Sequence, residues 1–81
     1  MNIQAEVSLY PLGDEEYSER IDAFIETLID SGLDVNLGTM ATSISGDLKE
    51  IFTILTEAFE EDSELGPAVM TVKVSNISPS D

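Results

Sequence analysis

Hydrophobic and polar residues alternate near the start and near the end of the chain. Because successive side chains of a strand point to opposite faces, each run predicts a half-buried strand with one polar face. In residues 3–10 the apolar positions are Ile3, Ala5, Val7 and Leu9, and the positions between them are Gln4, Glu6, Ser8 and Tyr10. In residues 68–75 the two sets are Ala68, Met70, Val72 and Val74 against Val69, Thr71, Lys73 and Ser75.

Two further segments carry apolar residues at steps of three and four, which is typical of amphipathic helices. The first stripe is Tyr17, Ile21, Phe24, Ile25 and Leu28, and the second is Leu48, Ile51, Phe52, Leu55 and Phe59. Asp14 is placed to cap the first helix, with Glu15 and Glu16 in its first turn, and Gly32 to end it. Asp47 with Glu50 predicts a capping box for the second helix, which should end between Glu61 and Glu64.

Two short strands are expected between the helices, one around Val35 and Leu37 and one leading to Ser45, joined near Gly38 to Met40. The order is then strand, helix, strand, strand, helix, strand. It predicts an α+β fold, the ferredoxin-like βαββαβ sandwich, with two helices on one face of a four-stranded antiparallel sheet. The first and third strands should be central, with the fourth beside the first. We expect a single domain over residues 1–81, with an ordered core of about 2–76 and a polar tail at 77–81.

The charge of the chain excludes several classes of function. Seventeen Asp and Glu face three Lys and Arg with no His, a formal charge of −14. So few basic residues cannot form a nucleic-acid interface, and anionic membrane surfaces should repel the chain. Without Cys or His, thiolate nucleophiles, cysteine zinc sites and Ser-His catalysis are excluded. No stretch approaches the ~20 apolar residues of a membrane span, so we expect a soluble cytoplasmic protein.

The acidic residues suggest solvation more than chemistry. Two carboxylates can act as an acid-base pair in catalysis, but among 17 acids such a pair is easily found by chance, so enzyme activity is not supported. No metal or cofactor is expected. The run Glu57, Glu60, Glu61, Asp62 and Glu64 lacks the ligand spacing of a calcium loop and is interpreted as a solvated helix end. Most other acids also fall on predicted helix surfaces. Such acidity suits a high-salt cytoplasm, which makes halophilic adaptation one interpretation.

The sheet face away from the helices is where a site is expected, because two helices can bury only one face. Its mixture of polar and apolar residues favours sheet-to-sheet dimerisation with a small-molecule pocket between the layers. Glu6 and Lys73 lie on neighbouring strands, which predicts a cross-strand ion pair. In a second interpretation, which is compatible with the first, Glu6 accepts hydrogen bonds from a ligand amine. Tyr10 either packs at an interface or stacks on a flat ligand. The Thr and Ser residues beside Gly38 have two interpretations: they form the turn and the strand, or they contact a ligand.

Three segments together resemble the small thiamine-binding protein family. They are Ala5 to Gly13, Gly38 to Gly46 and Val72 to Asn76, so the resemblance spans nearly the whole chain, from Ile3 to Asn76. The resemblance implies a ferredoxin-like fold, assembly into homodimers or homotetramers through sheet faces or edges, and binding of thiamine or its hydroxymethylpyrimidine part. The implied ligand-binding residues are Glu6, Ser8, Tyr10, Met40, Thr42, Ser43, Lys73, Ser75 and Asn76, with Leu12 as a further apolar contact.

Among these residues, Glu6 is the candidate for the aminopyrimidine ring, because a carboxylate can receive the exocyclic amine and the ring nitrogen side by side. The leading hypothesis is a non-catalytic binding protein for thiamine or a pyrimidine precursor. The alternative is a structural or regulatory oligomer whose sheet faces seal each other without a ligand. An enzyme acting on such a ligand ranks last.

Overall fold

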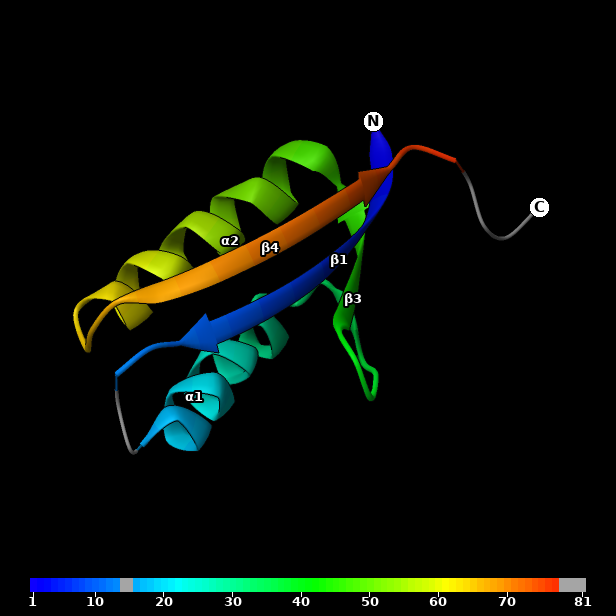
Figure 1. Cartoon of the computed structure of the whole chain (residues 1–81). Helices are drawn as coiled ribbons and strands as arrows, with labels where there is room; N and C mark the ends of the chain where they lie inside the picture. The colour runs from blue at the N-terminus through cyan, green and yellow to red at the C-terminus, as the bar shows by residue number, and fades with distance from the viewer. Residues whose placement is uncertain (14–15, 78–81) are drawn as a thin grey trace.

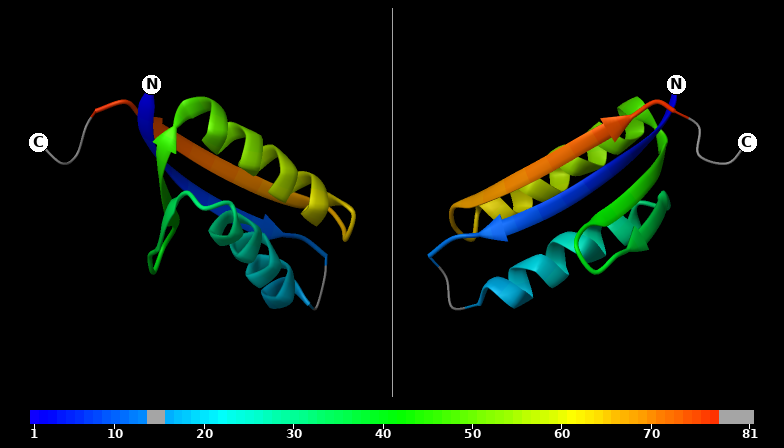
Figure 2. Two further views of the ribbon diagram at one scale, coloured as in Figure 1. Left: turned by 180° about the vertical axis from the view of Figure 1, so that it is seen from behind. Right: turned by 45° about the vertical axis from the view of Figure 1, so that its right-hand side comes forward.

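The computed structural model describes residues 1–13 and 16–77, and it confirms the predicted order of elements. Four strands and two helices follow one another along the chain (Figure 1). They are β1 (Asn2–Pro11), α1 (Tyr17–Asp30), β2 (Asp34–Leu37), β3 (Thr42–Asp47), α2 (Leu48–Ser63) and β4 (Ala68–Ser75). Both helices lie on the same side of the sheet, so the fold is the ferredoxin-like sandwich (Figure 2).

The sheet has the strand order β2-β3-β1-β4, and each neighbouring pair is antiparallel. β1 is therefore central and pairs with β3 through residues 2–7 and with β4 through residues 4–11. The two registers meet at Glu6, which stands opposite Ser43 on one side and Lys73 on the other. Past Val7 the structure pairs β1 with β4 alone, because β3 begins at Thr42.

The core lies between the helices and the inward face of the sheet. Its buried apolar side chains are Ile3, Ala5, Val7, Leu9, Phe24, Leu28, Ile44, Ile51, Leu55 and Ala58. Three residues predicted for this layer are more exposed than their pattern indicates: Tyr17 is 56% exposed, Phe52 42% and Val74 46%. Each lies near an end of its element or toward the β4 edge of the sheet, where the partner layer stops.

α1 begins later in the structure than the sequence predicts, whereas the predicted end of α1 and both predicted ends of α2 are confirmed. α1 begins at Tyr17, with Glu16 in the N-cap position, so Glu16 precedes the first turn. The predicted cap Asp14 and its neighbour Glu15 lie outside the described residues. Gly32 follows the α1 C-cap with φ of +84°, a left-handed conformation that favours glycine. Asp47 caps α2 by accepting hydrogen bonds from the backbone N–H groups of Lys49 and Glu50.

One acidic residue predicted to lie on a solvated helix end is buried. Asp62 is 3% exposed and accepts hydrogen bonds from Arg20 Nε at 3.0 Å and Arg20 Nη2 at 2.7 Å. The same Nη2 donates to the backbone carbonyls of Gly66 and Pro67. This bidentate pair joins the start of α1 to the end of α2 and to the loop before β4.

Within the described residues, no helix combines the length and the apolar character needed to cross a membrane.

Candidate functional site

A shallow cleft of about 240 Å³ lies on the open face, over β1 and β4. It is lined by Gln4, Glu6, Lys73, Val74 and Ser75. The register explains the grouping, because Gln4 stands opposite Ser75 and Glu6 opposite Lys73. We call this group the open-face cleft. It places a carboxylate and an ammonium group side by side on an exposed surface, next to two neutral hydrogen-bonding side chains.

The predicted ion pair between Glu6 and Lys73 is not formed in the structure. Among the described residues, the ion pairs shown are Met1 with Asp47 and Arg20 with Asp62. Glu6 and Lys73 are both exposed, and in water an ion pair of this kind gains at most about 1 kcal/mol. The Glu6 carboxylate is therefore accessible to a ligand without first losing a strong internal partner.

A second cavity, of about 260 Å³, lies where the β2–β3 hairpin, α1 and the end of β1 meet. We call it the hairpin cavity. Its walls are residues 7–10 of β1, residues 38–42 of the hairpin, and Ile21, Phe24 and Ile25 of α1. It forms beside the part of β1 that extends beyond β3. Ser8 Oγ donates a hydrogen bond to the Met40 carbonyl at 3.5 Å, so the strand and the hairpin loop contact each other here.

Gly38 shapes the hairpin wall of this cavity. Its N–H donates to the Ala41 carbonyl at 3.0 Å and closes the turn. A Cβ atom at position 38 would stand 2.7 Å from that same oxygen, closer than such atoms approach each other. Only glycine therefore fits here without moving the loop, and the loop in turn holds Met40 outward, 89% exposed.

Eight of the nine predicted ligand-binding residues fall into two adjacent groups rather than one. Glu6, Lys73 and Ser75 line the open-face cleft, and Ser43 stands beside Glu6 across the β1–β3 register. Ser8, Tyr10, Met40 and Thr42 line the hairpin cavity. Asn76 follows the end of β4 and is exposed. Leu12 is also exposed, beyond the end of β1.

Thr42, which the resemblance implies as a ligand contact, does not face the open side where the site is expected. Thr42 is 8% exposed and shares the inward side of β3 with Ile44, two residues further on. Its register partner is Val7, a core residue. Thr42 and Ser43 are neighbours in one strand and must point to opposite faces, so only Ser43 lies on the open side.

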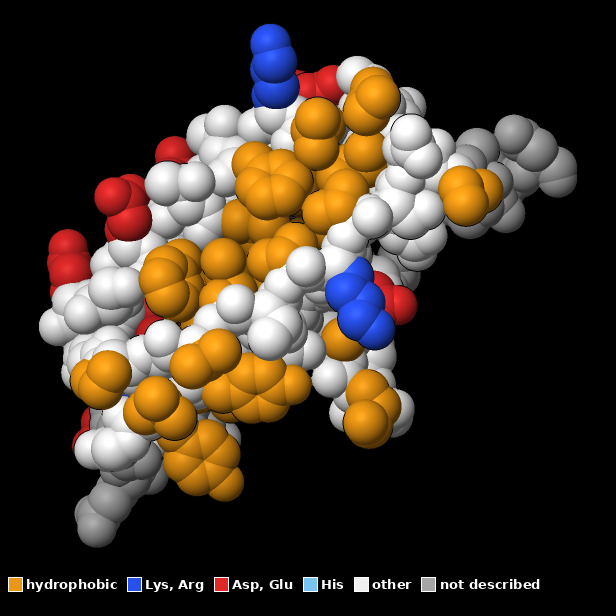
Figure 3. Space-filling view, turned by 45° about the horizontal axis from the view of Figure 1, so that its top comes forward, with side chains coloured by type: hydrophobic (Ala, Val, Ile, Leu, Met, Phe, Trp, Pro, Cys, Tyr) orange, Lys and Arg blue, Asp and Glu red, His pale blue; other side chains and the backbone are white. Residues whose placement is uncertain are grey.

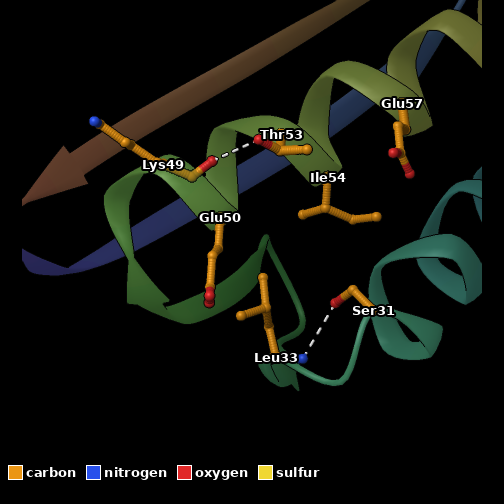
Figure 4. A pocket seen from close by; sticks show the side chains of 7 residues that line it. All are labelled: Ser31, Leu33, Lys49, Glu50, Thr53, Ile54 and Glu57. Carbon is orange, nitrogen blue, oxygen red and sulfur yellow. Dashed lines mark hydrogen bonds between the residues drawn. The ribbon is translucent and has the colours of Figure 1, made fainter.

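Sequence reasoning did not find the groove between the two helices. About 500 Å³ in volume, it is lined by Ser31, Leu33, Lys49, Glu50, Thr53, Ile54 and Glu57 (Figure 4). Both hydroxyl groups are engaged inside the protein: Ser31 Oγ accepts from Leu33 N–H, and Thr53 Oγ donates to the Lys49 carbonyl. Lys49 extends away from Ile54 and Leu33 in Figure 4. No residue pattern marks this groove, which arises only where α1 ends against α2.

Comparison with known proteins supports the fold and identifies the family. A hypothetical protein of Methanocaldococcus jannaschii has a similar structure with a TM-score of 0.87 and 28% identity, covering 99% of this chain and 84% of that one. A Thermotoga maritima protein, named as a candidate thiamine biosynthesis or salvage protein, has a TM-score of 0.86 at 18% identity, covering 95% and 85%. A domain of unknown function from Bacillus cereus has a TM-score of 0.81 at 23% identity, covering 99% and 79%.

The comparison with curated proteins finds no match. The profile of the YKOF-related family, in contrast, matches residues 2–81, which is nearly the whole sequence. The chain belongs to the YKOF-related family.

Proposed function

We propose that this protein is a non-catalytic binding protein for thiamine or its hydroxymethylpyrimidine part. The observation that supports it most is the position of Glu6, an exposed carboxylate on the open face between Ser43 and Lys73. A carboxylate can accept a hydrogen bond from the exocyclic amine of an aminopyrimidine and share a proton with the adjacent ring nitrogen. Such charge-assisted, paired hydrogen bonds are about twice as strong as neutral ones.

The two cavities suggest how a ligand with two linked rings would lie. Ser8 is two residues beyond Glu6 on the same face of β1, a separation of about 7 Å along a strand. A pyrimidine at Glu6 would then direct its second ring toward Ser8 and Tyr10, and the Tyr10 ring, 52% exposed, offers a stacking surface. The cationic thiazolium of thiamine is also attracted by a chain of net charge −14.

Two relations to other proteins are consistent with this proposal. The Thermotoga maritima neighbour, of similar fold, carries a thiamine-related name, and residue segments of this chain resemble small thiamine-binding proteins. Because the sequence identity to that neighbour is only 18%, its name suggests which ligand to test and carries no further weight. The proposal itself stands on the chemistry of Glu6.

Calorimetric titration with thiamine tests this function, and Glu6→Gln tests the site. Glu6→Gln should weaken binding by tenfold or more, because a lost charge-assisted hydrogen bond costs about 1.5–3 kcal/mol. Glu26→Gln, an exposed acid on α1, is the matched control and should bind as the unchanged protein does. Oxythiamine, with a carbonyl in place of the amine, should bind more weakly than thiamine. No heat at millimolar thiamine would reject the function, whereas equal binding by Glu6→Gln would reject the site alone.

A second candidate function is a structural oligomer sealed through its open faces. Tyr10 and Val69 favour it, since they are opposed in register and leave 52% and 48% of their surfaces exposed on that face. A crystal structure with the open faces packed dry, and with no cavity for a bicyclic ligand, would favour this candidate over the first.

A further inference from the structure

The groove where α1 ends against α2 has a volume of about 500 Å³, larger than either the open-face cleft or the hairpin cavity. We call it the interhelical groove. It shares no lining residue with those two sites. Ser31 and Leu33 line it from the end of α1 and the loop that follows, and the other lining residues belong to α2. A ligand held there would leave the open face of the sheet free.

The floor of the interhelical groove is apolar. Leu33 and Ile54 pack against the core from this side and remain half-buried. Ile54 points from α2 toward the loop that carries Leu33 (Figure 4). The two hydroxyl groups of the groove, on Ser31 and Thr53, are engaged in hydrogen bonds within the protein. The floor therefore suits a hydrocarbon group better than a hydrogen-bonding one.

A carboxylate stands at each end of this floor. Glu50 and Glu57 are seven residues apart on α2, which places them on the same side of the helix and about 10.5 Å apart along its axis. Ile54 lies between them, and all three side chains leave α2 on the same side in Figure 4. Both carboxylates are exposed, and neither forms an ion pair or a hydrogen bond with the side chain of another described residue. Two negative charges are thus open to a ligand, about two helical turns apart.

The surroundings of the groove also favour cations. α1 ends here, and its last turn has no basic residue to meet the negative end of the helix dipole. Lys49, the basic residue that lines the groove, extends away from Ile54 (Figure 4). Further acidic side chains follow the margin of α2, whereas an apolar band covers the side of α2 toward β4 (Figure 3). A ligand that fits this groove should carry positive charge at two points and hydrocarbon between them.

We propose that the interhelical groove binds an aliphatic diamine or polyamine, with one ammonium group at Glu50 and another at Glu57. The methylene chain between them lies on Leu33 and Ile54. Six methylenes in an extended chain hold two ammonium nitrogens about 9 Å apart, close to the spacing of the two carboxylates. An inorganic cation would meet one carboxylate and gain nothing from the apolar floor. This site is separate from Glu6, so the outcome of its test is independent of the thiamine titration.

Amide chemical-shift titration with hexane-1,6-diamine tests the site, at about 0.15 M salt to screen diffuse attraction. The amide signals of Leu33 and Ile54 should shift, and that of Glu6 should not. Butane-1,4-diamine and hexylamine should bind about three- to fivefold more weakly, because each engages one carboxylate and an exposed ion pair contributes that much to affinity. Unshifted groove amides at about 10 mM hexane-1,6-diamine, or equal binding of the three amines, would overturn the proposal.

Glu50→Gln and Glu57→Gln test which carboxylates hold the ligand. Each should weaken binding of hexane-1,6-diamine about three- to fivefold and remove most of its advantage over hexylamine, since one ammonium group has lost its partner. Glu60→Gln removes an equal charge from an exposed position of the same helix outside the groove. It is the matched control and should leave both affinities unchanged. An equal loss for Glu60→Gln, or an advantage over hexylamine that persists in both groove variants, would indicate diffuse attraction and overturn the proposal.

Discussion

Arg20 and Asp62 show how a single pair of residues links elements that are distant in sequence. Their side chains are 3% and 1% exposed, and Arg20 also bonds the carbonyls of Gly66 and Pro67. Arg20 is one of three basic residues in a chain with 17 acids. A buried carboxylate is tolerated when its charge is paired and its oxygens are hydrogen-bonded. The pair therefore fixes where α1 begins relative to the end of α2.

Arg20→Met should lower the free energy of unfolding by about 3–5 kcal/mol, because it leaves Asp62 buried without its partner. Urea denaturation measures the loss, with Lys49→Met, which removes an exposed cation, as the control. The double variant with Asp62→Leu should recover much of the lost stability, since no buried charge remains. A loss below about 1 kcal/mol for Arg20→Met would contradict a structural role for the pair.

Asp47 is the residue at which pH should act on the start of α2. Hydrogen bonds from the Met1 ammonium group, and then from the Glu50 backbone N–H, lower the pKa of the Asp47 carboxyl below its usual value of 3.8. A lowered pKa means that the folded state favours the carboxylate. Its stabilising contribution is therefore complete above pH 3.8 and is lost as the pH falls below it.

The comparison protein for this effect is Asp47→Ser, which can still accept the capping hydrogen bonds but does not titrate. The difference in melting temperature between the two proteins should be constant from pH 7 to pH 5, and should shrink below pH 3.8. A difference that stays constant down to pH 2.5 would contradict the capping role of the carboxylate.

At the scale of elements, α2 carries its charges in an unfavourable order. No basic residue lies in its last turn, where the helix dipole favours cations, and Glu60 and Glu61 lie there instead. The contact of Thr27 Oγ with Glu61 and the burial of Asp62 satisfy two of the acids. Glu60 remains exposed, with its charge opposed to the dipole.

Glu60→Lys should stabilise the protein by about 0.3–1 kcal/mol at low salt, because a cation suits a helix C-terminus. The same substitution at Glu50, in the first turn, is the matched control and should destabilise it. Melting temperatures in low and molar salt measure both effects, and the unchanged protein should gain stability as salt is added. A melting temperature that is equal in the two conditions would refute the prediction.

At the scale of the molecule, a net charge of −14 on 81 residues opposes any assembly of copies. Screening shortens the reach of this repulsion from about 30 Å at 0.01 M salt to about 10 Å at 0.1 M. An interface that is apolar and free of acids should therefore strengthen as salt rises. The two edges of the sheet differ in this respect, since β2 begins with Asp34 and β4 has no acid.

The dissociation constant of any assembly of copies of this chain should fall as salt increases from 0.01 to 1 M, as measured by sedimentation across the series. Weaker assembly at higher salt would indicate an interface held by ion pairs.

The candidate site was predictable in its residue types and only partly in its arrangement. Alternation in β1 and β4 correctly placed Glu6, Lys73 and Ser75 on the open face. The resemblance implied Thr42 as a ligand contact, but Thr42 lies two residues from the buried Ile44 in β3 and therefore faces inward. The hairpin cavity depends on where β3 begins relative to β1. Pairing of distant segments sets that register, and no local pattern encodes it.

The sequence by itself determined the elements, their order and the open face of the sheet, because periods of two and 3.6 residues are local properties of the chain. It also determined the caps at Gly32 and Asp47, where one residue suffices. Only the tertiary structure decided that Asp62 is buried against Arg20, that Phe52 and Val74 remain exposed, and that the predicted site divides into two cavities. The physical reason is that burial depends on which distant element covers a residue, and here the helix layer ends before the sheet does.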